Sequence, residues 1–98
     1  MTNPQKDPHE EKISVETISD TTFRVTVTGK RVTTHTVMLT SSYYQALTNG
    51  VVSPELLVEK SFRFLLERES NASILSSFDL FVIGQYFPEY ESTIRRML

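Results

Sequence analysis

The spacing of apolar residues changes near residue 40, and this change limits the fold more than any other feature of the sequence. Before residue 40, apolar and polar side chains alternate, as at Phe23, Val25 and Val27. A period of two is typical of strands with one buried face. After residue 40, the apolar residues follow the spacing of helices. Strands followed by helices predict an α+β fold.

Two turn signals divide the alternating region into three strands. Ser19-Asp20-Thr21 ends a first run that carries Ile13 and Val15 on one face. Gly29-Lys30 fits a tight hairpin turn in which the glycine takes a positive φ, and a third run follows from Val32 to Leu39. We therefore expect a three-stranded antiparallel β-meander.

The length of the loop at Gly29-Lys30 decides which face of the sheet carries the basic side chains. A loop of two or four residues sends Arg24, Arg31 and His35 to the face opposite Phe23. A loop of three residues with a bulge reverses the third strand and places His35 beside Phe23 in the core. The sequence is compatible with both registers.

The strongest helix signal lies at Ser53-Pro54-Glu55, which supplies an N-cap, a proline at the first helical position and an acid at the positive end of the dipole. This helix should run to about Glu69. Its apolar side chains span roughly 200°, about twice the stripe of an ordinary surface helix. It must therefore be covered on more than one side, by the sheet, by the C-terminal segment or by a second copy of the chain.

Further helices are expected on either side of the long one. A short capped helix should end at Asn49-Gly50, a second should cover about 78–87 before Pro88, and a short final helix could form over 89–98. The predicted fold is a meander followed by two or three helices packed on one face, with the long helix at the centre.

Length and composition favour one domain. A chain of 98 residues can bury one modest core. Residues 1–11 contain two prolines and no apolar residue after Met1, so we expect a disordered tail followed by a single domain at 12–98. The sequence contains no cysteine, no apolar run long enough to span a bilayer and no apolar segment typical of a secretory signal. These features predict a soluble cytoplasmic protein.

Charge is distributed unevenly along the chain. The formal net charge is −2, yet residues 21–50 carry only basic charge, from Arg24, Lys30 and Arg31, with His35 in the same block. These four residues are candidate contacts for an anion or a nucleic acid. The alternative is that the basic side chains protect a sheet edge from pairing with other chains.

The sequence offers little for catalysis. It has only two histidines, His9 and His35, no metal-ligand spacing and no glycine-rich phosphate loop. We therefore expect no catalytic, metal-binding or cofactor-binding residues, and not an enzyme.

Large apolar side chains supply the candidate interface instead. Aromatic residues often anchor interfaces, although in a chain of this size many of them must form the core. The candidates are Leu57, Phe62 and Phe64 on the long helix, with Phe81, Tyr86 and Tyr90 beyond it.

Residues 35–68, HTVMLTSSYYQALTNGVVSPELLVEKSFRFLLER, follow the order strand, short helix, glycine turn, long helix. This stretch partly resembles the ribbon-helix-helix family of DNA-binding regulators. In that family, two copies pair one strand each, and outward side chains read the major groove. The resemblance implies outward positions at Thr34, Thr36 and Met38, where the family usually has Arg, Lys, Asn or Gln. The whole sequence, with its closing FDLFVIGQYFPEYE, is also similar to small uncharacterised bacterial domains, which implies no activity.

These observations favour a small non-enzymatic protein-interaction or regulatory domain. Its partner would be an unidentified protein or a second copy in a homodimer. The alternative is a dimeric, ribbon-helix-helix-like DNA-binding regulator that uses the basic β-hairpin.

Overall fold

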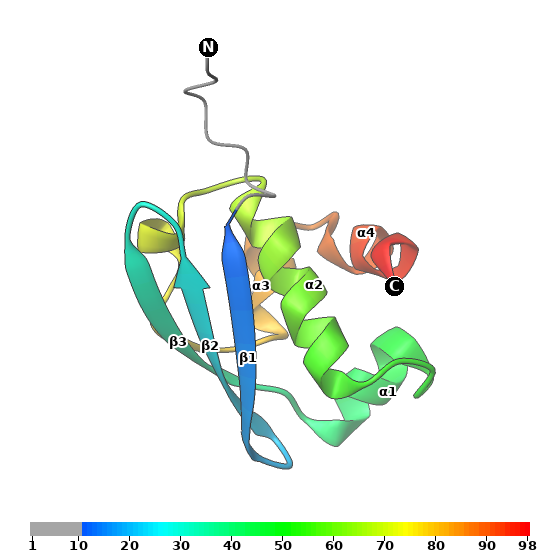
Figure 1. Cartoon of the computed structure of the whole chain (residues 1–98). Coiled ribbons are helices and arrows are strands. Elements are labelled where there is room, and N and C mark those ends of the chain that lie inside the picture. The colour runs from blue at the N-terminus through cyan, green and yellow to red at the C-terminus, as the bar shows by residue number, and fades with distance from the viewer. Residues whose placement is uncertain (1–10) are drawn as a thin grey trace.

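Four strands form one mixed sheet in the computed structural model, which describes residues 11–98 (Figure 1). The order across the sheet is β1 (Lys12–Ser19), β2 (Thr22–Thr28), β3 (Val32–Met38) and β4 (Ser77–Asp79). The first three strands are antiparallel, and β4 lies parallel to β3. The α+β class and the antiparallel meander are therefore confirmed, and a fourth strand is added. The predicted tail at 1–11 lies outside the described residues except for Glu11.

The β2–β3 register corresponds to a loop of three residues. Thr28 pairs with Val32 and Val25 pairs with His35, so His35 shares the inner face with Phe23 and Val25. The prediction that Gly29 takes a positive φ is wrong, because only Asn49 and Gly50 do so among residues 11–98. A Cβ at Gly29 would lie 2.8 Å from Glu11 Oε2, so glycine provides room for that side chain.

Four α-helices and one 3₁₀ turn follow within the described residues, where two or three helices were expected. They are α1 (Ser41–Thr48), α2 (Pro54–Leu66), the 3₁₀ turn η2 (Asn71–Ser73), α3 (Val82–Tyr86) and α4 (Tyr90–Met97). The predicted caps are present: Ser53 Oγ accepts from the Leu56 N–H at 3.1 Å, and Asn49 ends α1 at a φ of 55°. None of the helices in residues 11–98 is long and apolar enough to cross a membrane.

The helix predicted over 78–87 is wrong in its first part, where β4 forms instead. The Thr36 N–H donates to the Ser76 carbonyl and the Leu80 N–H donates to the Met38 carbonyl, each at 2.8 Å. Phe78 is 7% exposed and points into the core. A strand of three residues shows no detectable period, so long-range pairing with β3 decides the conformation here.

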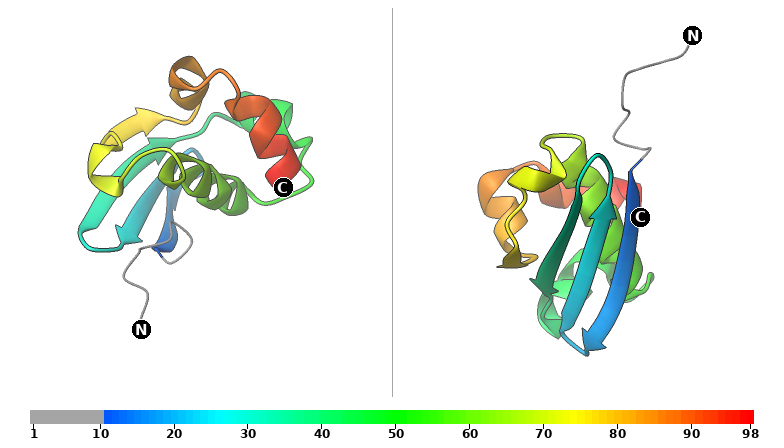
Figure 2. Two further views of the ribbon diagram at one scale, coloured as in Figure 1. Left: turned by 90° about the horizontal axis from the view of Figure 1, so that it is seen from above. Right: turned by 60° about the vertical axis from the view of Figure 1, so that its left-hand side comes forward.

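All the helices lie on one side of the sheet, and no helix of the described residues covers its other face (Figure 2). Helix α2 lies between the sheet and α4 (Figure 1). Leu57, Phe62, Phe64 and, from α4, Tyr90 are each 0% exposed. The wide apolar surface of α2 is therefore covered within one chain, and it requires no second copy.

A buried pair of hydroxyl groups joins α2 to α4. Ser61 Oγ donates to the Leu57 carbonyl at 2.7 Å and lies 2.6 Å from the Tyr90 hydroxyl. Because the Ser61 hydrogen is already used, the Tyr90 hydroxyl donates to Ser61 Oγ. Burial of Tyr90 raises the pKa of its phenol. Ser61 thus allows close approach of the helices and satisfies the one polar atom of the Tyr90 side chain.

Candidate functional site

An apolar cavity of about 230 Å³ opens between the end of α2, the segment that precedes β4, and α3. Its floor is formed by buried side chains that include Leu65, Ile74 and Ile83, whereas Leu75 and Tyr86 at its edge are 48% and 67% exposed. We call this cavity the α3 groove. It is lined by Leu65, Glu69, Ser73, Ile74, Leu75, Phe78, Val82, Ile83, Tyr86 and Phe87.

Ile74 and Leu75 are neighbours in the sequence, and the local backbone explains why one lies in the core and the other at the groove edge. Ile74 is extended, with φ −76° and ψ 137°. Neighbouring side chains on an extended backbone point in opposite directions. Ile74 therefore enters the core, where it is 7% exposed, while Leu75 points outward.

Polar side chains from β3 and η2 hold this segment in place. The Leu75 carbonyl can only accept, so His35 Nδ1–H donates to it, at 2.7 Å. In the neutral imidazole, Nε2 then accepts from Thr33 Oγ1 at 2.9 Å. Asn71 Nδ2 donates to Thr33 Oγ1 at 3.0 Å and to the Arg31 carbonyl at 3.1 Å. The four side-chain bonds form one consistent network that fixes the His35 tautomer and attaches the groove edge to the sheet.

Glu69 is the one charged residue that lines the α3 groove within residues 11–98. It also lines an adjoining cavity of about 380 Å³. Its side chain makes no hydrogen bond or ion pair within the described residues. Burial raises the pKa of its carboxyl group, because partial desolvation disfavours the charged form.

The adjoining cavity brings Glu69 near two of the predicted basic residues. Lys30 and Arg31, at the tip of the β2–β3 hairpin, line this cavity together with Glu69 and Asn71. Both basic residues are exposed, and within residues 11–98 neither forms an ion pair. Two carboxylates, Glu11 and Glu69, and two cations thus lie around one polar cavity, and no ion pair joins them within residues 11–98.

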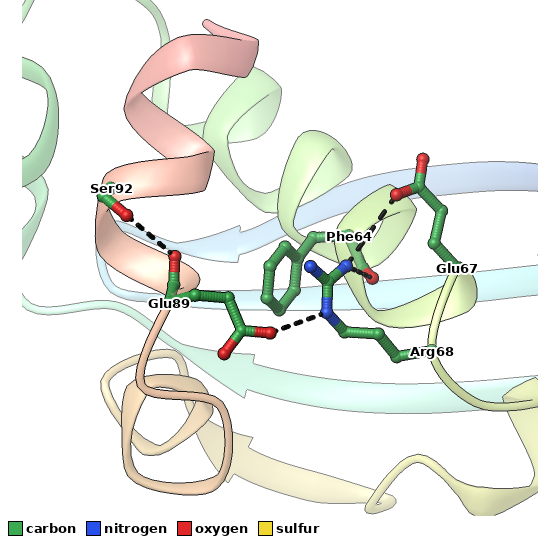
Figure 3. Close-up of polar contacts among 5 residues, drawn as sticks. All are labelled: Phe64, Glu67, Arg68, Glu89 and Ser92. Atoms are coloured by element: carbon green, nitrogen blue, oxygen red, sulfur yellow. Dashed lines mark hydrogen bonds and ion pairs between the residues drawn. The ribbon is translucent and has the colours of Figure 1, made fainter.

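The guanidinium group of Arg68, the residue before Glu69, already contacts Phe64 and Glu89 (Figure 3). Its guanidinium carbon lies 3.6 Å from the centroid of the Phe64 ring, its Nε donates to Glu89 Oε2 at 3.1 Å, and its Nη1 donates to the Phe64 carbonyl at 3.0 Å. The pKa of Glu89 is lowered by its own backbone N–H and by Arg68. Ser92 Oγ also donates to the Glu89 carbonyl within the first turn of α4, and the bond between Arg68 and Glu89 attaches this turn to the end of α2.

The predicted anion contacts do not form one surface. Arg24 lies on the outer face of β2 and is paired with Glu16 at 3.0 Å, whereas Lys30 and Arg31 lie at the hairpin tip. His35 is 2% exposed, because the three-residue loop turns it inward. It is therefore not available to an anion.

The predicted interface residues divide into two groups. Leu57, Phe62, Phe64 and Tyr90 form the core at 0% exposure, so they are not a docking surface. Phe81 and Tyr86 are exposed, at 48% and 67%. Tyr86 lines the α3 groove, whereas Phe81 packs edge-on against Tyr43, with ring centroids 5.5 Å apart.

The groove also contains residues that the sequence did not single out, chiefly Glu69, Leu75 and Val82. The adjacent apolar pair Ile74 and Leu75 in a stretch rich in serine was the available signal, because only one of two neighbours on an extended backbone can enter the core.

The strand that carries the ribbon-helix-helix resemblance is internal to the sheet. β3 pairs with β2 on one edge, and β4 occupies its other edge at Thr36, Val37 and Met38. These three positions have no free edge on which a strand from a second copy could pair.

Within residues 11–98, no group of three His, Asp or Glu side chains is placed to hold a metal ion. No family model, curated protein or solved structure matches this chain.

Proposed function

We propose that this chain is a non-enzymatic protein-interaction domain that binds an apolar side chain of a partner protein in the α3 groove. The observation that carries the proposal is the apolar cavity of about 230 Å³ with Leu75 and Tyr86 exposed at its edge. An apolar cavity of about 150 Å³ accommodates benzene, so this one can hold a Leu or Phe side chain. It is smaller than the roughly 300–1,000 Å³ typical of sites for whole small molecules.

Two exposed side chains at the groove edge add apolar contact area. Leu75 and Tyr86 would lose their exposure to water when a peptide covers them, and tyrosine is among the residues most enriched at interface hot spots. Full burial of one large apolar side chain contributes about 1.5–3 kcal/mol. The anchor together with the exposed parts of Leu75 and Tyr86 is worth about 3–6 kcal/mol, so a peptide with a single anchor should bind weakly, with a Kd of about a millimolar.

The test is an NMR titration of the ¹⁵N-labelled full chain with acetylated, amidated hexapeptides. Each peptide carries one Leu, Phe or Met, with Gly, Ser, Lys and Glu at the other positions. We expect saturable shifts in the amide signals of residues 73–75 and 82–87. Shifts confined to other regions, or no shifts at millimolar peptide, would contradict the proposal.

Two variants distinguish binding in the α3 groove from non-specific apolar association. Leu75→Glu places a charge at the groove edge and should weaken the tightest peptide at least fivefold. Val51→Glu is the matched control, because Val51 is 81% exposed and lies outside the groove. Equal weakening by both variants would indicate non-specific apolar contact.

The DNA-binding alternative is favoured by one observation: Lys30 and Arg31 at the hairpin tip form no ion pair with any other residue of 11–98. It predicts shifts in residues 24–34 on titration with a 20-base-pair duplex. Binding should weaken steeply with salt, by about 0.9 in the log–log slope for each phosphate contact. Replacing both residues with alanine should weaken binding at every DNA sequence, and unchanged affinity would exclude the phosphate contacts.

A further inference from the structure

We propose that Glu69 selects partner segments in which a lysine or arginine lies next to the apolar anchor. This inference rests on the proposed function of the α3 groove and adds the chemistry of the ligand. The anchor would enter the apolar cavity, and the neighbouring basic side chain would pair with the Glu69 carboxylate at its mouth.

The first argument is that no cation of the described chain pairs with Glu69. Its side chain makes no hydrogen bond or ion pair within residues 11–98, although it is partly removed from water. The adjacent Arg68 is held by Phe64 and Glu89 (Figure 3). A partly desolvated carboxylate without a partner is unfavourable, and a cation from the ligand would offset this.

The second argument is position. Glu69 lines both the apolar groove and the polar cavity, so a ligand that passes from one to the other must pass the carboxylate. A basic residue beside the anchor would be close to Glu69 while the anchor remains in the groove. A charge-assisted hydrogen bond at this point would fix which residue of the segment enters the cavity.

The third argument concerns the far side of Glu69. Lys30 and Arg31 line the polar cavity together with Glu11, and neither cation has a carboxylate within ion-pair distance in the described residues. An acidic residue that follows the basic one would meet these two cations. The complementary segment thus has the order apolar, basic, acidic, and exchange of its two charges would place like charges together.

The test uses the labelled chain and a set of acetylated, amidated peptides with one leucine. The parent peptide has leucine, lysine and, after a glycine, glutamate; it is made in both chain directions. One variant replaces lysine with glutamine, and another exchanges lysine and glutamate. A fourth peptide has a free N-terminal amine next to leucine and glutamine in place of lysine.

We expect the parent to bind about three- to tenfold more tightly than the glutamine peptide, and the exchanged peptide to bind more weakly than both. Glu69→Gln should abolish the difference between lysine and glutamine. Glu69→Lys should reverse it in favour of a peptide with glutamate beside leucine. Glu59→Gln, the same change on α2 outside the groove, should leave the preference intact.

The outcomes separate the two proposals. If the lysine and glutamine peptides bind wild-type protein in the α3 groove with equal affinity, the role of Glu69 is overturned and the groove function stands. If no peptide binds in the groove, the groove function itself is overturned. Tighter binding of the free amine than of the lysine peptide would overturn the assignment to a basic side chain in favour of a chain terminus.

Discussion

Residues 12–38 and residues 71–87 are built in different ways. The first region is a meander in which long antiparallel ladders pair β1 with β2 and β2 with β3. The second region contains a 3₁₀ turn of three residues, a strand of three and a helix of five. The second region depends on the first, because Asn71 and the Leu75 carbonyl bond to groups on the hairpin.

This difference coincides with the distribution of exposed apolar side chains. Of the six large hydrophobic residues exposed in the described chain, three lie in the shorter second region, namely Leu75, Phe81 and Tyr86, and two lie in the longer first region, namely Ile18 and Val32. Regular ladders form a stable platform, whereas binding segments are usually drawn from the less stable parts of a protein. The meander thus holds the groove in place through a few hydrogen bonds, which are made by the side chains of His35 and Asn71.

The largest effect is expected from Phe62→Ala, because Phe62 lies between the two regions. Its ring is 5.3 Å from the His35 ring and 6.0 Å from that of Phe78, and its side chain is 0% exposed. The cavity should cost about 3–5 kcal/mol of unfolding free energy, measured by urea denaturation. If that variant does not fold, Phe62→Leu should still show a loss of about 1–2 kcal/mol. A loss below about 0.5 kcal/mol in the leucine variant would contradict this account.

His35→Leu should weaken the connection between the two regions and leave the meander itself largely intact. The change removes the hydrogen bonds that the imidazole makes with the Leu75 carbonyl and with Thr33 Oγ1. It should lower the unfolding free energy by about 1–3 kcal/mol. Hydrogen exchange should accelerate most at the Thr36 and Leu80 amides, which join β3 to the second region. Thr34→Val, on the outer face of the same strand, is the control. Uniform acceleration over β1 and β2 would show that the tether does not act locally.

Asn71→Ala should lower the unfolding free energy by a smaller amount, about 1–2 kcal/mol, because the Arg31 carbonyl and Thr33 Oγ1 lose the amide donor. Peptide affinity in the groove should fall while exchange within β1 and β2 stays unchanged. The exposed Ser70→Ala serves as its control. An unaltered groove affinity would mean that His35 alone positions the segment.

The smallest effect is a pair of opposite pH dependences. The pKa of Glu89 is lowered in the folded chain, so it contributes stability above its ordinary pKa that is lost as pH falls through the folded value. The pKa of Glu69 is raised, so the stability that its protonated form contributes at low pH is lost as pH rises. Between about pH 3 and pH 7, Glu89→Gln should become progressively more destabilising. Glu69→Gln should become progressively more stabilising. The measurement is the urea midpoint of each variant relative to wild type at several pH values. If both differences change with pH in the same direction, this assignment is wrong.

The sequence predicted the elements whose signals are local. Alternation identified the three long strands, Ser53 and Pro54 marked the start of α2, and Asn49-Gly50 marked the end of α1. These features depend on side-chain spacing and capping, which a single sequence displays directly.

Long-range features could not be predicted in the same way. β4 exists because Ser76 and Leu80 bond to a strand far away in the sequence. His35 points inward because the loop between β2 and β3 has three residues. A loop shorter or longer by one residue would turn it outward, and the sequence was compatible with both orientations. Glu69 is a candidate because it lines a cavity and has no side-chain partner in the part of the chain that the structure describes, and neither fact is visible before the fold is known.

The parallel placement of β4 beside β3 has a kinetic consequence. The contact between His35 and Leu75 joins residues 40 positions apart, across both α1 and α2. The two hairpins of the meander close short loops, but β4 can dock only after a long loop has closed, which is entropically slower. The groove should therefore be the last part of the molecule to acquire its native shape during refolding. A groove that forms last becomes accessible only once the chain beneath it has folded.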